Sequence, residues 1–177
     1  LAYSTISQLS YITLGLALAN SLGVLGGALH IATHAVGKIT LFMCAGSIYV
    51  ATHKTNVSEL DGLGRIMPIT FSAFLVGAVS IIGLPPFGGS WSKWLLVLGA
   101  IEADQILIVA AFMISSILNV AYLLPIISRA FFVPPIKSSF DYTSGIKEAP
   151  ILCWLPTVFT ATGCLILFFY SGYVYNF

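Results

Sequence analysis

The chain has 177 residues, of which 58% are hydrophobic and 7% are charged, and its mean hydropathy is +1.00. Soluble domains carry roughly 25% charged residues, so this composition excludes an ordinary soluble domain. The net charge of +1 gives no electrostatic basis for nucleic-acid binding. Apolar runs of about 20 residues recur along the chain and predict an all-α integral membrane protein.

Five membrane crossings are expected, with the third one interrupted. In chain order they cover about Ala2–Asn20, Leu22–Ala51, Met67–Ile101, Ala103–Phe132 and Pro150–Tyr173. The first stretch has no basic segment and no small-residue cleavage site, so it is not a signal peptide. Because residue 1 is Leu rather than Met, we expect a piece of a longer protein.

The third crossing is predicted to be a discontinuous helix. Its centre holds four helix breakers, since proline lacks an N–H and glycine loosens the backbone: Pro85, Pro86, Gly88 and Gly89. The apolar piece that follows, Trp91–Ile101, would reach about 16 Å, which is half a bilayer. A break at membrane depth is tolerated where it is buried in protein or lines a wet cavity. The alternative is a tight loop at the membrane surface before a re-entrant or interfacial helix.

Basic residues predict the orientation. With five crossings, loops 52–66 and 133–149 fall on one side, and the turns on the other side carry no Lys or Arg. The positive-inside rule places both loops in the cytoplasm, and we expect a bacterial-type cytoplasmic (inner) membrane.

His30, His34 and Lys38 are spaced four residues apart in the second predicted span. At this spacing they share one helix face and cover about 12 Å of depth. A lysine at the bilayer centre costs about 2.5–3.5 kcal/mol on insertion scales, so this face should point into the bundle or a wet cavity. Burial favours a neutral amine and histidine titrates near neutral pH, so the three groups predict a stretch of a proton relay.

Two other interpretations of these residues stay open. HxxxH spacing can bind zinc, but the glutamate of HExxH is missing and Lys38 one turn away disfavours a metal. Alternatively, the three side chains hydrogen-bond neighbouring helices and have a purely structural role.

Lys93 is the second cation inside a predicted span, at the start of the half-helix. Ser90 is expected to cap that helix. The positive end of the helix dipole and burial both favour a neutral amine, which makes Lys93 a candidate terminal proton carrier. The alternative is a lysine that snorkels toward an interface between the belt aromatics Trp91 and Trp94.

Other chemistry has little support. No nucleophile–base pair, phosphate loop or ligand set for a flavin, haem or iron–sulfur cluster is recognisable, so no catalytic residue, metal or cofactor is expected. The three cysteines lack CxxC spacing and are expected to be buried thiols: Cys44, Cys153 and Cys164. Polar residues are expected to give the first helix a polar face or to serve packing of the fourth: Tyr3, Ser4, Ser7, Gln8, Ser115, Ser116 and Asn119.

Three segments in order carry a family resemblance: LAYSTISQLSY, HIATHAVGKITLFMCAGSIY and LDGLGRIMPITFSAFLVGAVSIIGLPPFGGSWSKW. From Leu1 to about Leu96 the chain resembles the antiporter-like membrane subunits shared by respiratory complex I (NADH:quinone oxidoreductase) and Mrp-type Na⁺/H⁺ antiporters. The resemblance implies two inverted five-helix repeats, each with one broken helix and a proton half-channel. This chain then corresponds to the C-terminal portion, with the truncated second repeat at 1–132, a cytoplasmic loop at 133–149 and a further transmembrane helix at 150–177.

The resemblance also implies roles for single residues. Lys38 matches the central lysine of the family, and His30 and His34 match the connecting histidines. Lys93 matches the lysine of the second broken helix on the exit side. Other complex I members carry glutamate there, so Lys93 favours an Mrp D-like or terminal complex I type.

We therefore expect a proton-translocating subunit of a multisubunit Na⁺/H⁺ antiporter. Its partners would be the other subunits of the assembly, protons, Na⁺ and the lipid bilayer. The alternatives are a proton-pumping subunit of complex I or a related membrane-bound hydrogenase, a structural subunit with a degenerate site, and an unrelated secondary transporter.

Overall fold

A computed structural model describes residues 2–134 and 148–175, with side chains up to residue 171, and all regular elements in these ranges are helical. The α-helices are α1 (Ala2–Ala17), α2 (Ser21–Thr52), α3 (Pro68–Ile82), α4 (Gly89–Glu102), α5 (Ile106–Phe132) and α6 (Ile151–Tyr175). Two short 3₁₀ turns, η1 (Val57–Glu59) and η2 (Leu63–Arg65), lie between α2 and α3. The prediction of an all-α chain is confirmed for the described residues.

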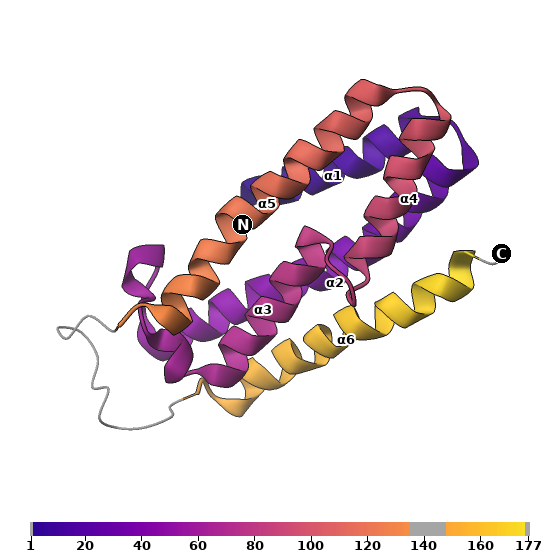
Figure 1. Cartoon of the computed structure of the whole chain (residues 1–177). Helices are drawn as coiled ribbons and strands as arrows, with labels where there is room; N and C mark the ends of the chain where they lie inside the picture. Colours follow the sequence, from indigo (N-terminus) through magenta and orange to yellow (C-terminus); the bar gives the residue numbers. More distant parts are fainter. Residues whose placement is uncertain (1, 135–147, 176–177) are drawn as a thin grey trace.

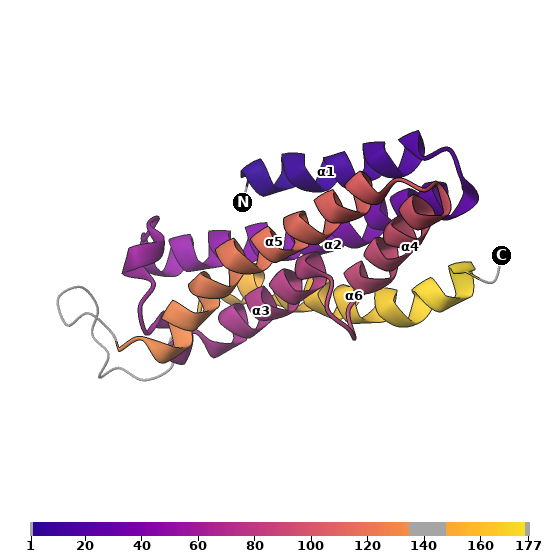
Figure 2. The same cartoon turned by 45° about the horizontal axis from the view of Figure 1, so that its top comes forward.

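The long helix α2 is the axis of the fold. Helices α1, α3, α4 and α6 all pack against it, and α3 and α4 lie one after the other along its length (Figures 1 and 2). Helix α5 packs against α1, α3 and α4. Three helical segments in the described part are long and apolar enough to cross a membrane: Ser21–Thr52, Ile106–Phe132 and Ile151–Ser171.

The backbone between α3 and α4 is not helical. Helix α3 ends at Ile82, and Gly83 follows with φ of 91°, a left-handed conformation that favours glycine. Pro85 and Pro86 come next, and α4 begins at Gly89, which is therefore a helical residue rather than part of the interruption. A Cβ on Gly89 would lie 1.9 Å from the Ser80 carbonyl oxygen, so only glycine fits where α4 starts against α3.

The prediction that Ser90 caps α4 is wrong. The N-cap residue is Gly88, two residues earlier than expected. Ser90 lies inside the helix, where its Oγ donates to the Phe87 carbonyl at 2.8 Å. The glycine pair therefore allows the helix to begin before the serine.

Glycines bring α2 and α4 into backbone contact. Asn20 caps α2 by accepting from Gly23 N at 2.8 Å, and its Nδ2 donates to the Gly99 carbonyl at 2.6 Å. A Cβ on Gly99 would lie 2.7 Å from Gly23 N. This close approach aligns the start of α2 with the end of α4, and so fixes the register of the side chains between them.

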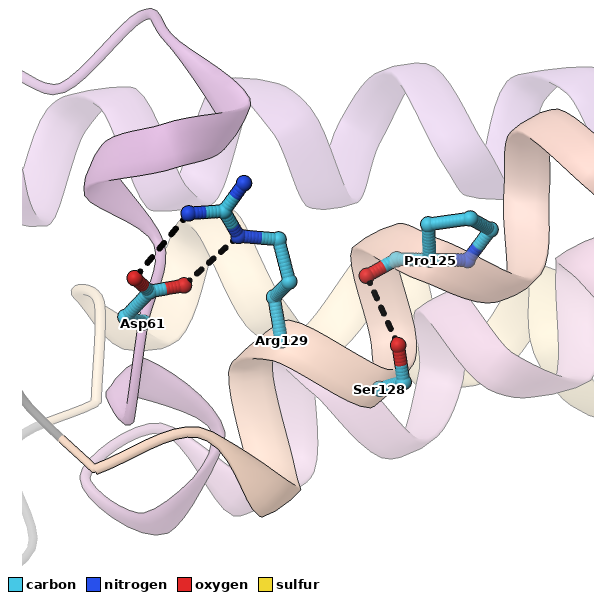
Figure 3. Close-up of polar contacts among 4 residues, drawn as sticks. All are labelled: Asp61, Pro125, Ser128 and Arg129. Atoms are coloured by element: carbon cyan, nitrogen blue, oxygen red, sulfur yellow. Dashed lines mark hydrogen bonds and ion pairs between the residues drawn. The ribbon is translucent and has the colours of Figure 1, made fainter.

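An ion pair joins the connector between α2 and α3 to the end of α5 (Figure 3). Arg129 Nε and Nη2 donate to the two carboxylate oxygens of Asp61 at 2.8 and 3.1 Å. Arg65 Nε donates to the Phe131 carbonyl at 3.1 Å. Next to Arg129 in the chain, the Ser128 hydroxyl donates to the Pro125 carbonyl at 3.1 Å. The hydrogen bonds from Arg129 hold the pKa of Asp61 below its usual value.

The cysteines are free thiols. Cys44 and Cys164 are buried as predicted, whereas Cys153 is only half-buried because it lies in the first turn of α6. Most of the predicted loop 133–149, with Lys137 and Lys147, lies outside the described residues.

Candidate functional site

The three basic residues of α2 point into the helix bundle. His30, His34 and Lys38 are 2%, 8% and 5% exposed, so none of them lies on the outer surface of the chain. The His30 and His34 rings are stacked, with centroids 6.0 Å apart and an interplanar angle of 13°. The three side chains therefore lie on one buried face, as their spacing predicts.

Lys38 is held by the first helix. Its Nζ donates to Ser4 Oγ. On α5, the Tyr122 hydroxyl donates to Asn119 Oδ1 at 2.7 Å. The amine therefore has a hydroxyl partner on α1, and a second hydroxyl holds an amide on α5.

His30 has a partner at each ring nitrogen. Its Nε2 lies 3.1 Å from Gln8 Oε1, and its Nδ1 lies 3.0 Å from Ser92 Oγ. Gln8 Nε2 donates to Asn119 Oδ1 at 3.2 Å. Hydrogen bonds therefore join His30 through Gln8 on α1 to Asn119 and Tyr122 on α5.

His34 contributes differently. Its Nε2 is buried and has no hydrogen-bond partner in the part of the chain that the structure describes. The ring stacks on His30, but its Nε2 takes no part in the hydrogen bonds from His30 through Gln8 to Asn119. A buried nitrogen of this kind is a place where a water molecule would be favourable.

Lys93 is buried and reaches across the interruption between α3 and α4. Its Nζ donates to the Ile82 carbonyl at 3.0 Å and to Ser116 Oγ at 3.4 Å. The side chain is 8% exposed, so it does not extend outward as a snorkelling lysine would. The expectation from the dipole of α4 is wrong, because the amine lies at the carbonyl end of α3, where the dipole favours a positive charge.

Tyr11 contacts both His30 and Lys93. Its ring stacks on the His30 imidazole with centroids 5.3 Å apart, and Lys93 Nζ lies 5.1 Å from the centre of the same ring. The Tyr11 hydroxyl lies 3.3 Å from Ser116 Oγ, which is also a partner of Lys93. The structure therefore brings His30, His34, Lys38 and Lys93 into one buried polar region.

A cavity of about 650 Å³ lies beside Lys93. Its wall is mostly apolar and comes from α1, α4, α5 and the segment between α3 and α4; its polar groups include Tyr11, Ser90, Lys93 and Ser116. A water molecule occupies about 30 Å³ in the liquid, so this volume is large enough for several waters next to the amine.

Several residues of this region were not predicted as part of the site. Ser92 and Tyr122 had no predicted role, and Ser4, Gln8 and Asn119 were assigned only to a polar face or to packing. Helical periodicity would have predicted some of these site residues. Ser4, Gln8 and Tyr11 recur at spacings of four and three residues, which places them on one face of α1. Tyr3 is not on that face and is exposed.

Residues 1–119 match the family model described as NADH:quinone oxidoreductase/Mrp antiporter, TM. The chain belongs to this family. The resemblance inferred from the sequence is thereby confirmed, and the chain is an integral membrane subunit of the antiporter-like type. The apolar helices of sufficient length agree with this assignment.

Family members from complex I are similar to the chain in sequence. NADH-quinone oxidoreductase subunit N of Desulforudis audaxviator is 44% identical over 175 residues, which cover 94% of this chain and 35% of that relative. NAD(P)H-quinone oxidoreductase chain 5 of Synechocystis sp. is 38% identical over 116 residues, covering 60% of this chain and 17% of the relative. The chain thus spans about a third or less of the length of these antiporter-like subunits.

Solved structures of two kinds share the fold. A chain of the Mrp complex from Dietzia sp. DQ12-45-1b superposes with a TM-score of 0.87 at 24% identity, covering 98% of this chain and 40% of that one. A chain of respiratory complex I from Thermus thermophilus with bound NADH gives 0.85 at 25% identity, covering 98% and 35%. The fold is therefore common to both kinds of assembly.

Proposed function

We propose that this chain is the C-terminal portion of a proton-translocating subunit in a multisubunit membrane assembly. The observation that carries the proposal is one buried polar region that holds the amines of Lys38 and Lys93 together with the hydrogen bonds from His30 through Gln8 to Asn119. Buried amines and imidazoles inside a membrane protein are costly and mark ion or proton pathways. The solved structures that share the fold are multisubunit membrane assemblies, so the partners are other subunits of such an assembly.

In this proposal the proton is held on Lys38, His30, His34 and Lys93, because an amine and an imidazole each have a stable neutral form in an apolar surrounding. Hydroxyl groups can pass a proton onward because each of them both donates and accepts; those in contact with the carriers are Ser4, Ser92 and Ser116. Water in the cavity beside Lys93 gives the proton a way out, so Lys93 is the terminal carrier.

The proposed topology has five crossings. Helices α3 and α4 together form one interrupted crossing, and α1 forms the first. Supporting this, α3 and α4 follow one another along α2, and their 15 and 14 residues are together long enough to span. Residues 1–132 form the second repeat, loops 52–66 and 133–149 face the cytoplasm across the inner membrane, and 150–177 form the last helix.

Two kinds of assembly are candidates. The 44% identity to subunit N of NADH-quinone oxidoreductase favours a complex I type, in which electron transfer in other subunits drives the relay. Lys93 in place of glutamate favours an Mrp D-like or a terminal complex I type, as the sequence-based expectation has it. Identifying the subunits that purify with the native protein separates these two.

The test of the proposal is proton transport by the assembly after Lys38→Ala or Lys93→Ala. Both variants are expected to lose transport, because each removes a group that holds the proton. Lys54→Ala is the matched control, since Lys54 lies in the connector after α2 and outside the polar region. Transport at the wild-type rate by both variants would refute the proposal.

A further inference from the structure

We infer that Gln8 and Asn119 are positioning residues that hold His30 as the Nε2–H tautomer, so that Nδ1, on the Ser92 side, is the atom that takes up and releases the proton. The inference rests on the proposed function. It adds which ring nitrogen of His30 exchanges the proton and which residues select the tautomer. It is carried by a chain of donors and acceptors whose directions are fixed at one end.

The fixed end is the Tyr122 hydroxyl. It donates its hydrogen to Asn119 Oδ1 at 2.7 Å. An amide oxygen only accepts, so this bond sets the Asn119 amide with its oxygen toward Tyr122.

Asn119 transmits this direction to Gln8. Its Oδ1 accepts from Tyr122 on one side and from Gln8 Nε2 on the other, at 3.2 Å, which uses the two lone pairs of an amide oxygen. Turning the Asn119 amide over would set its Nδ2 against Gln8 Nε2, donor against donor. Gln8 and Asn119 are 0% and 1% exposed, so solvent cannot supply a substitute partner.

Gln8 in turn selects the tautomer of His30. Because its Nε2 is used on Asn119, its Oε1 faces His30 Nε2 at 3.1 Å. An amide oxygen carries no hydrogen, so the hydrogen between these two atoms belongs to His30 Nε2. In the neutral ring Nδ1 is then the acceptor, and it receives the Ser92 hydroxyl hydrogen over 3.0 Å.

Ser92 makes both charge states of His30 possible without moving a helix. Its hydroxyl has a second acceptor, the Gly89 carbonyl at 3.1 Å. When the neutral ring gains one proton from the relay at Nδ1, the new N–H donates to Ser92 Oγ and the serine hydrogen turns to Gly89. Release of the proton reverses the rotation, so the hydrogen bond between His30 Nδ1 and Ser92 is made in both states, and the bond from Ser92 to Gly89 only in the charged state.

The test measures the tautomer directly. In the complete assembly labelled with ¹⁵N-histidine, the two ring nitrogens of neutral His30 are distinguished by NMR, with His30→Gln used to assign them. The wild type is expected to carry its hydrogen on Nε2. Loss of one buried hydrogen bond shifts an equilibrium by about tenfold, so Gln8→Leu and Asn119→Leu should each change the tautomer ratio by about tenfold and slow proton transport.

Two further variants complete the design. Gln8→Glu keeps an oxygen facing Nε2 and should keep the tautomer. Thr13→Val is the control on the same helix, because the Thr13 hydroxyl donates only to the Ser10 carbonyl, and it should change neither readout. A wild-type His30 with its hydrogen on Nδ1, or a Gln8→Leu variant with an unchanged tautomer ratio or wild-type transport, would overturn the inference. Normal transport after Lys38→Ala and Lys93→Ala would instead overturn the proposed function, whatever the tautomer.

Discussion

The amine of Lys93, on α4, donates to the carbonyl of Ile82, the last residue of α3, at 3.0 Å. This bond crosses the interruption between the two helices and places the cation where the dipole of α3 is negative. Lys93, the proposed terminal carrier, therefore also links α4 to the end of α3 by a hydrogen bond. Its charge is coupled to the geometry of the segment between these two helices.

Lys93→Arg separates these two roles. Arginine keeps the positive charge and the donors, so the tie to Ile82 and the heat stability of the assembly should be retained. It does not release its proton in proteins, so proton transport should be lost. Lys93→Met should lose both. Thermal unfolding and transport measured on the same preparation check this, and an arginine variant that transports normally would contradict the role of Lys93 as a carrier.

His30 and His34 should differ in their effect on stability. His30→Phe leaves Gln8 and Ser92 without their ring partner, which costs about 1–3 kcal/mol for an unsatisfied buried group. His34→Phe removes a ring whose Nε2 has no partner in the described part of the chain, so stability should change little. The unfolding temperatures of the two variants test this difference. Equal losses of stability would contradict the claim that His30 is held by hydrogen bonds and His34 is not.

Gly99→Ala should destabilise the contact between α2 and α4. The added Cβ would lie 2.7 Å from the backbone nitrogen of Gly23, and overpacking of this kind costs about 1–3 kcal/mol. Gly46→Ala is the matched control, because a Cβ there meets nothing within 4 Å. Heat stability should fall only for Gly99→Ala; a loss of similar size at Gly46 would refute the packing argument.

Asp61→Asn should flatten the acid dependence of stability. Arg129 lowers the pKa of the Asp61 carboxyl in the folded state, so the ion pair contributes stability above the unfolded value of about 3.9 and loses it as pH falls through the folded pKa. The wild type should therefore be more stable than the variant above about pH 4, and the two should converge in stronger acid. The effect is modest because Arg129 is partly exposed. Parallel stability curves down to strong acid would contradict the pair's contribution.

The resemblance of three segments was sufficient for the family. Sequence patterns were sufficient for the helical class and for the burial of the four titratable residues in the predicted spans, because both depend on local spacing or composition. They placed His30, His34 and Lys38 on one buried face, as the structure has them. Partners between helices could not be derived in this way. Gln8 and Asn119 are 111 residues apart, and only the packing of α1 against α5 brings their amides together.

The errors at the start of α4 have a similar origin. Local rules made Ser90 the cap and put Lys93 under the dipole of its own helix. The actual cap is Gly88, and the flexible lysine side chain reaches the end of α3 instead. Local rules do not include a neighbouring helix end that offers a better site for the charge.

The central claim is that Lys38 and Lys93 belong to one proton path. The most direct measurement is a double-mutant cycle of proton transport in proteoliposomes containing the complete assembly, with Lys38→Ala, Lys93→Ala and both together. Groups in one series path are strongly non-additive, so the double variant should transport no more slowly than the slower single variant. If the two losses multiply, or if either single variant keeps the wild-type rate, the two lysines do not share a path.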